Sequence, residues 1–259
     1  MRRLLLPCLL SLLWSPALLA APVAKPVEWK IGSDTFSGYL VYDDSVKTPR
    51  PGLVMVPNWK GVNDSAIEKA HLVAGDDYVV LVADVYGKGV RPKTDAEAGP
   101  VATAMRADRP KLRARVRNAV EVLKQQSASL VDHARIGAFG YCFGGSTVLE
   151  LVRAGDALAG VVSLHGGLAT DLPAAGAVKT PVMVLNGGDD TYVSAAEITA
   201  FQDEMRKAGA DWQFVNFSGA VHCFAESDAQ NPPGCVYHER SARRAYRMMA
   251  DFFAEMFAK

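Results

Sequence analysis

The sequence has no excess of charge of either sign. Its 28 Lys and Arg residues balance its 28 Asp and Glu residues, and like charges do not gather in long runs. Proteins that bind nucleic acid or anionic membrane surfaces through charge carry a basic surplus or a basic patch. We therefore expect no nucleic-acid partner and no binding to a membrane surface. No internal repeat is evident either, which argues against a repeat architecture.

The five histidines form no metal-binding pattern. No two of them share, with a carboxylate, the spacing that zinc sites use, so we expect no metal site. His71, His133 and His238 lie in or beside expected helices, where surface or packing roles are typical. His165 and His222 each follow an expected strand and are therefore candidates for chemistry.

Cysteine is scarce, with four residues in the whole chain. Cys8 lies in an N-terminal segment that we expect to be removed, which leaves Cys142, Cys223 and Cys235. An odd number of cysteines in an exported protein suggests one disulfide and one free thiol. Cys223 and Cys235 are 12 residues apart across a loop-like stretch, so their pairing would leave Cys142 free. The alternative is three unpaired thiols.

Only one long hydrophobic run is present, and it lies at the N-terminus. Arg2 and Arg3 precede the apolar residues 4–19, and the small residues 20–22 follow. This is the order of a secretory signal peptide, so we expect residues 1–20 to be cleaved and the protein to be periplasmic or secreted. A membrane anchor is the alternative, but the run is short for a bilayer span and holds two prolines.

The remainder alternates short apolar runs with helical patterns. Residues 52–57 and 181–185 are continuously apolar, as is typical of strands buried on both faces of a sheet. Alternating strands and helices predict an α/β fold with a mostly parallel sheet covered by helices on both faces. Residues 27–31 and 36–42 predict an antiparallel hairpin at its edge. No linker interrupts the pattern, so residues 21–259 are expected to form one domain.

The other expected elements follow from the same patterns. The helices are residues 65–74, 108–126, 146–153, 194–209 and a last helix from about residue 239, and the further strands are residues 78–83, 136–139, 160–164 and 211–217. Ser65 with Glu68, and Ser194 with Glu197, are capping signals at two helix starts. Residues 84–107, rich in Gly and Pro, are expected to be irregular. Side chains on one face of the last helix should join the core: Tyr246, Met249, Phe253 and Met256.

Residues 135–151, RIGAFGYCFGGSTVLEL, hold the most informative pattern. A strand, a turn with glycines on both sides of Cys142, and a helix make up the nucleophile elbow G-x-S-x-G, with Cys in place of Ser. The glycines permit a tight turn, and the N–H groups at the start of the helix favour a thiolate or an oxyanion. The alternative is a glycine-rich connection that holds a buried structural cysteine.

A cysteine nucleophile needs a base, and the base needs a carboxylate that orients it. In the α/β-hydrolase fold these groups follow the nucleophile in the order acid, then histidine, each in a loop after a strand. Asp190 follows the strand at 181–185, and His222 follows the strand at 211–217. We therefore expect a triad of Cys142, Asp190 and His222, with Asp189 as the alternative acid.

The same fold predicts where an oxyanion would bind. The N–H of Phe143, directly after the nucleophile, is one expected donor, and the N–H of Trp59 in the first strand-to-helix loop is the other. Polar and aromatic residues of the neighbouring loops are candidates for substrate binding: Asn58, Tyr86, Tyr141, His165 and Tyr192.

These pieces together resemble the dienelactone hydrolase family. The matching segments are GYCFGG around Cys142, NGGDDTYV around Asp190, GAVHCF around His222, and the earlier PNWKGVND and ADVYG. The resemblance implies an α/β-hydrolase fold and a cofactor-free Cys-His-Asp triad. It also implies cleavage of an ester, lactone or related small molecule through a thioester, as in a carboxymethylenebutenolidase. Members acting on the dienelactone carry a Glu where this chain has Asn58, which cannot hold a proton, so the family's substrate is not carried over.

Two other kinds of function remain open at this point. One is a binding protein of the same fold that has no useful chemistry. The other is a thiol redox protein, although no second cysteine lies close to Cys142 in the sequence. The sequence is compatible with a monomer or a small homo-oligomer.

Overall fold

The structure is a computed structural model that describes residues 22–126 and 129–258. The expected signal peptide, residues 1–20, lies outside the described residues. Within the described ranges, no helix is both long enough and apolar enough to cross a membrane.

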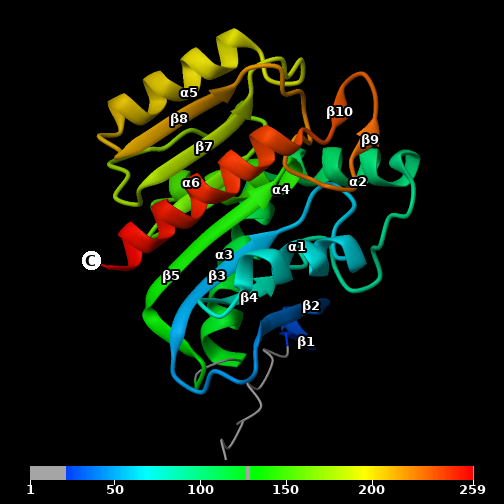
Figure 1. Cartoon of the computed structure of the whole chain (residues 1–259), viewed down its shortest axis with the longest axis vertical. Coiled ribbons are helices and arrows are strands. Elements are labelled where there is room, and N and C mark those ends of the chain that lie inside the picture. Colours follow the sequence, from blue (N-terminus) through cyan, green and yellow to red (C-terminus); the bar gives the residue numbers. More distant parts are fainter. Residues whose placement is uncertain (1–21, 127–128, 259) are drawn as a thin grey trace, which may run out of the picture.

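An eight-stranded sheet forms the centre of the molecule, in the order β1-β2-β4-β3-β5-β6-β7-β8 (Figure 1). The first two strands pair antiparallel, and β2 also joins β4 antiparallel, whereas every further neighbouring pair is parallel. The strands are β1 (Pro22–Ile31), β2 (Asp34–Asp43), β3 (Arg50–Val56), β4 (Val79–Val82), β5 (Val131–Tyr141), β6 (Val161–Leu164), β7 (Val182–Gly187) and β8 (Trp212–Phe217). The mostly parallel sheet with an antiparallel N-terminal edge is confirmed.

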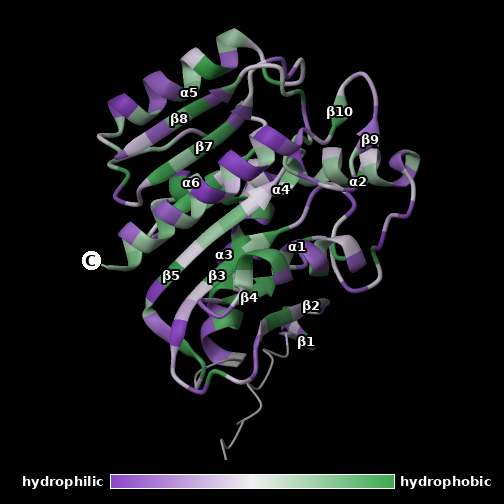
Figure 2. Cartoon of the chain, in the orientation of Figure 1, coloured by the Kyte–Doolittle hydropathy of each residue, from purple (hydrophilic) through white to green (hydrophobic). Residues whose placement is uncertain are grey.

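Helices cover both faces of the sheet and divide the core into two clusters. On one face lie α1 (Asp64–Ala74) and α6 (Glu239–Phe257). On the other lie α2 (Asp95–Ala107), α3 (Arg109–Gln126), α4 (Phe143–Arg153) and α5 (Ala195–Lys207). Buried apolar residues dominate β3, β4, β6 and β7, while α5 and α6 alternate apolar and hydrophilic residues (Figure 2). Burial of both faces explains the continuous apolar runs of the parallel strands.

The expected apolar face of α6 is largely confirmed. Met249, Phe253 and Met256 are buried in the cluster, and Tyr246 packs against it half-buried. The structure also contains a short hairpin that the sequence did not predict, formed by β9 (Gln230–Asn231) and β10 (Cys235–Val236).

Three helices differ from the prediction. Helix α4 begins at Phe143, directly after the nucleophile, and not at Ser146. Helix α1 begins at Asp64, one residue earlier than predicted, because its N-cap is Asn63 and not Ser65: the Asn63 side chain accepts the N–H of Ala66 at 2.8 Å. Residues 84–107 are not irregular throughout, since they contain α2, whose capping box joins Thr94 and Glu97. A glycine and a proline inside α2 hide its helical pattern in the sequence. The capping box of Ser194 and Glu197 at α5 is confirmed.

The parallel strands place one set of loops at a single edge of the sheet. The segments that directly follow β3, β5, β7 and β8 carry Trp59, Cys142, Asp190 and His222 respectively. Ligands of open α/β sheets bind at this carboxyl edge of the strands. The residues predicted to be catalytic are therefore brought together by the topology.

Candidate active site

Cys142 occupies the sharp turn between β5 and α4. Its backbone has φ 53° and ψ −113°, a conformation that is strained for any residue other than glycine. Two flanking glycines make the turn possible because the backbones approach very closely. A Cβ on Gly140 would lie 2.3 Å from the carbonyl oxygen of Gly144, and one on Gly144 would lie 1.9 Å from the carbonyl oxygen of Val56.

The backbone around Cys142 is held by several hydrogen bonds. Its N–H donates to the carbonyl of Leu164 at 3.0 Å and to Nδ1 of His165 at 3.2 Å. Its carbonyl accepts the N–H of Ser146 at 3.1 Å, which begins α4. The thiol therefore lies at the N-terminus of a helix, where the helix dipole favours a negative charge.

His222 and Asp190 form a direct pair. Nδ1 of His222 lies 2.7 Å from Oδ2 of Asp190, and both side chains are buried or nearly so. The other carboxylate oxygen of Asp190 accepts the N–H of Tyr192 at 2.8 Å. Asp189 is exposed, so the structure favours Asp190 over the alternative acid. This pairing leaves Nε2 of His222 available for the reaction.

The surroundings of His222 favour its charged form. Burial lowers the pKa of the imidazole, but hydrogen bonds and charges from Asp190 and Cys142 outweigh that effect and raise the pKa to about 10. Asp190 and Cys142 thus both favour a proton on this ring. A positive ring beside a sulfur at a helix N-terminus stabilises the thiolate, the nucleophilic form of cysteine.

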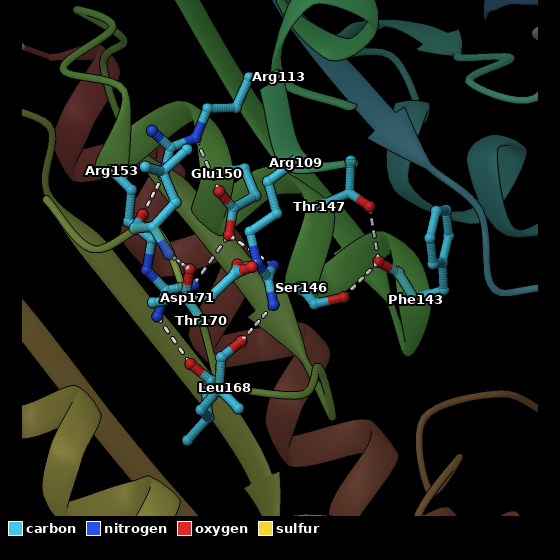
Figure 3. A network of polar contacts seen from close by, with 12 residues as sticks. Arg109, Arg113, Phe143, Ser146, Thr147, Glu150, Arg153, Leu168, Thr170 and Asp171 are labelled. Atoms are coloured by element: carbon cyan, nitrogen blue, oxygen red, sulfur yellow. Dashed lines mark hydrogen bonds and ion pairs between the residues drawn. The ribbon is translucent and has the colours of Figure 1, made fainter. Parts of the chain in front are cut away.

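The residues that carry the two expected oxyanion donors, Phe143 and Trp59, both accept hydrogen bonds through their carbonyl groups. The carbonyl of Phe143 accepts the hydroxyls of Ser146 and Thr147, both at 2.8 Å, within the first turn of α4 (Figure 3). The carbonyl of Trp59 accepts the hydroxyl of Tyr86 at 3.0 Å. Among the described residues, no hydrogen bond uses the N–H of Phe143 or Trp59 as donor. Both donors are thus available to a ligand.

A cavity of about 710 Å³ opens over these groups, large enough for a drug-sized molecule. Its walls come from loops, from the helices α2, α3, α4 and α5 and from the β9–β10 hairpin, and they include Asn58, Trp59, Arg106, Cys142, Tyr192 and His222. The ring of Tyr192 stands edge-on to His222, with the ring centroids 5.1 Å apart.

Two of the five candidates for substrate binding, Asn58 and Tyr192, line this cavity. The other three are buried behind its wall, where backbone or side-chain partners hold their polar groups. Tyr86 is bonded to Trp59, the hydroxyl of Tyr141 lies 2.9 Å from that of Tyr246, and His165 is bonded to the N–H of Cys142. These three side chains are therefore not placed to contact a substrate in the cavity directly.

The disulfide between Cys223 and Cys235 is confirmed. It links the residue after His222 to β10, and the N–H of Val236 donates to the carbonyl of His222 at 3.1 Å. The disulfide and this hydrogen bond therefore anchor the loop that carries the expected base to β10. Within the described residues, Cys142 is the remaining free thiol.

A buried ionic network supports the helix behind the nucleophile (Figure 3). Glu150 of α4 is fully buried and pairs with Arg109 at 3.0 Å, Arg113 at 2.8 Å and Arg153 at 3.2 Å. Arg153 donates to the carbonyl of Leu168 at 2.7 Å, and Arg109 donates to that of Ala169 at 3.0 Å. The network joins α3 and α4 to the loop after β6, one wall of the cavity.

Sequence reasoning missed several cavity residues, among them Glu226, Arg106 and Arg109. Glu226 follows His222 by four residues, so its place in the same loop was a usable signal. The two arginines belong to α2 and α3, and their approach to the cavity depends on the helix that the sequence did not predict. No three His, Cys, Asp or Glu side chains in residues 22–126 and 129–258 gather as a metal site.

A parallel sheet with a nucleophile elbow at the end of β5, and loops after β7 and β8 that carry an acid and a histidine, defines the α/β-hydrolase class. Within that class, the model of the "Dienelactone hydrolase family" matches residues 36–257. The chain therefore belongs to the dienelactone hydrolase family.

Known proteins of this family are similar along most of the chain. A solved structure named "m3DLH" is 34% identical with a TM-score of 0.86, covering 92% of this chain and 99% of its own. The crystal structure of P91, a dienelactone hydrolase-like promiscuous phosphotriesterase from metagenomic libraries, is 32% identical with a TM-score of 0.85 and the same coverage. A Salmonella typhimurium protein named "Putative carboxymethylenebutenolidase" is 23% identical over 79% of this chain and 77% of its own length. The chain is therefore a hydrolase that acts on the ester bonds of esters or lactones.

Proposed function

We propose that this enzyme hydrolyses small carboxylic esters or lactones through a covalent thioester on Cys142. The observation that carries the proposal is that a free thiol and the histidine of the His222–Asp190 pair line one cavity, which Trp59 also lines. Cys142 is the proposed nucleophile, His222 the acid and base, and Asp190 the group that orients the imidazole.

The proposed reaction begins from the ion pair of thiolate and imidazolium. The sulfur attacks the carbonyl carbon, and the N–H groups of Phe143 and Trp59 stabilise the oxyanion that forms. When the C–O bond breaks, His222 donates its proton to the leaving alcohol, and the acyl group stays on Cys142 as a thioester. Neutral His222 then takes a proton from water, which attacks the thioester. The acid leaves, and the thiolate and imidazolium are restored.

The two rival functions are less well supported. Membership in a hydrolase family argues against a binding protein without chemistry. A redox role for Cys142 needs a second thiol, but Cys223 and Cys235 are bonded to each other. Labelling by iodoacetamide at neutral pH adds a direct check, because an inert thiol at Cys142 would favour the binding protein.

The test is a panel of esters and lactones, offered to the wild-type protein and to Cys142→Ala. The panel includes a phosphotriester, because the 32% identical relative is described as a promiscuous phosphotriesterase. We expect Cys142→Ala to lose turnover while its circular dichroism spectrum stays unchanged. Turnover that survives the substitution would eliminate the mechanism.

We also propose that the protein is exported and then cleaved near residue 20. The order of charged, apolar and small residues at the N-terminus supports this, and so does the disulfide, since such bonds persist in oxidising compartments. Mass spectrometry of the periplasmic or secreted protein should find a chain that begins at residue 21 or 22. A full-length chain in the cytoplasm would contradict the proposal.

A further inference from the structure

The turn that carries the second oxyanion donor is held at the peptide unit between Trp59 and Lys60. The hydroxyl of Tyr86 donates to the carbonyl of that unit, which is the carbonyl of Trp59. Oδ1 of Asn58 accepts the N–H of the same unit, that of Lys60, at 3.0 Å, and Nδ2 of Asn58 donates to Oε2 of Glu226 at 2.5 Å. The Asn58 amide therefore links the turn to Glu226, on the loop of the catalytic histidine.

Glu226 is built into this position. Its side chain is only 3% exposed, and its backbone N–H donates to the carbonyl of Cys223 at 2.9 Å, so the disulfide loop holds it. Lys69 of α1 lies 3.4 Å from the same carboxylate oxygen and 2.7 Å from Asp228, and compensates the buried charge. Burial raises the pKa of Glu226, while Lys69 and Asn58 oppose that rise. The hydrogen bond from Asn58 and the approach of Lys69 fix Oε2 of Glu226 in place.

We propose that Glu226 is a positioning residue for the oxyanion hole: through Asn58 it holds the N–H of Trp59 toward the reacting carbonyl. The inference rests on the function proposed above. It also means that the base and the oxyanion donor are coupled, because Glu226 follows His222 by four residues in a loop closed by the Cys223–Cys235 disulfide.

Chemistry explains why these two residue types fit the task. A hydrogen bond from an amide to a carboxylate is stronger and shorter than one between neutral groups. Asn58 uses its oxygen on the turn and its nitrogen on Glu226, so both ends of the amide are engaged. An oxyanion donor must lie within about 3 Å of the developing charge, and a displacement of about 1 Å can lower the rate by about 100-fold.

A second route from Glu226 leads to the nucleophile instead. Burial holds the pKa of His165 well below its usual range, so the ring is neutral; Nδ1 accepts the N–H of Cys142 and Nε2 carries the proton. That Nε2 lies 3.9 Å from Oε1 of Glu226, beyond hydrogen-bonding distance. A long contact makes this route weaker than the 2.5 Å bond to Asn58. The experiment must separate the two.

The experiment compares ester turnover with alkylation of Cys142 by iodoacetamide in the same variants. Alkylation needs the thiolate but forms no oxyanion. We expect Glu226→Ala and Asn58→Ala each to lower kcat by about 10- to 100-fold, with KM changed by less than about 3-fold. Alkylation should stay within about 2-fold of wild type. The double variant should be no slower than the slower single variant, because both substitutions remove the same link.

Two further variants test whether the bond or the charge matters. Glu226→Gln keeps an oxygen that can accept from Asn58, so its kcat should stay within about 3-fold of wild type. Asp228→Asn removes the other carboxylate partner of Lys69 and leaves the Asn58 bond intact, so it is the matched control. If Glu226→Ala does not fold, Asn58→Ala replaces it in the test. This substitution removes the same hydrogen bond, and Asn58 is the half-exposed partner.

Three results would overturn the inference. Equal losses of turnover and alkylation would place the effect on the thiol, by way of His165. Unchanged kcat in both Glu226→Ala and Asn58→Ala would make the link structural only, and equal losses in Glu226→Ala and Glu226→Gln would show that the charge matters instead. Failure of the proposed function looks different, because Cys142→Ala would then retain turnover whatever these variants do.

Discussion

Cys142 and His165 share an unusual property at the scale of single residues. Both have a positive φ, 53° and 40°, although neither is glycine. Such conformations are unfavourable and persist where the surroundings impose them, often at functional sites. The hydrogen bond between the N–H of Cys142 and Nδ1 of His165 connects the two strained residues. The geometry of the nucleophile is therefore set by the ends of two neighbouring strands, β5 and β6.

The pair of Asp190 and Asp189 allows a matched test of the acid. Asp190→Asn removes the charge that orients and stabilises the His222 imidazolium, so we expect kcat to fall by about 100-fold or more. Asp189 is adjacent in sequence but exposed, so Asp189→Asn should leave kcat within about 2-fold of wild type. Steady-state kinetics on one activated ester measure both. Equal effects of the two substitutions would refute the assignment of Asp190.

The raised pKa of His222 also predicts how stability depends on pH. The imidazole has a pKa of about 10 in the folded protein, above its ordinary value of 6.5, so folding is favoured by the extra proton. This contribution is complete below pH 6.5 and is lost as the pH rises toward about 10. Urea unfolding across that window should show stability falling with pH.

Asp190→Asn is the control for this measurement, because without the carboxylate the His222 pKa falls and the slope above pH 6.5 should become shallower. An NMR titration of the His222 ring would locate the pKa directly. A ring that titrates near 6.5 in the wild-type protein would contradict both the stability argument and the resting ion pair.

At the scale of elements, α4 connects the nucleophile to the buried ionic network around Glu150. Its N-terminus carries Cys142 and Phe143, and its body is completely buried. Glu150 lies two turns further on and pairs with three arginines, which come from α3 and from α4 itself. The helix that presents the nucleophile is thus fastened to its neighbours by charge as well as by apolar packing.

Substitution of Glu150 tests this support. Glu150→Ala leaves three buried or half-buried guanidinium groups without their shared partner, which should lower the free energy of unfolding by about 3–5 kcal/mol. Glu121 of α3 provides the control, because its pair with Lys124 is exposed and Glu121→Gln should change stability by less than about 0.5 kcal/mol. Chemical denaturation measures both variants. A loss for Glu150→Ala below about 1 kcal/mol would show that the network contributes little.

The elements that could be predicted from the sequence are those with a local signal. Buried parallel strands leave continuous apolar runs, the elbow leaves its glycines, and the Ser194–Glu197 box marks the start of α5. Helix α2 could not be found in this way, because Gly99 and Pro100 lie inside it and its capping box was not recognised. The predicted start of α1 was wrong because Ser65, the expected N-cap, instead donates a hydrogen bond to Asp228. Only the tertiary structure creates this contact.

At the scale of the whole molecule, the order of the strands determines the site. The residues at 142, 190 and 222 come from three loops, and the parallel sheet places all three at one edge. That order, together with the residue types, predicts the triad from the sequence, and the number and spacing of the cysteines predict the disulfide, which is confirmed. The roles of Asn58 and Glu226 required coordinates, since they are 168 residues apart and their contact leaves no sequence pattern.

The central claim is that Cys142 carries the acyl group during turnover. Mixing the protein with an activated ester and quenching in acid within the first turnover should give an intact mass increased by that of the acyl group. Peptide mapping should place the adduct on Cys142, and Cys142→Ala should show none. Turnover without any such adduct, or an adduct on another residue that forms as fast as product appears, would contradict the account.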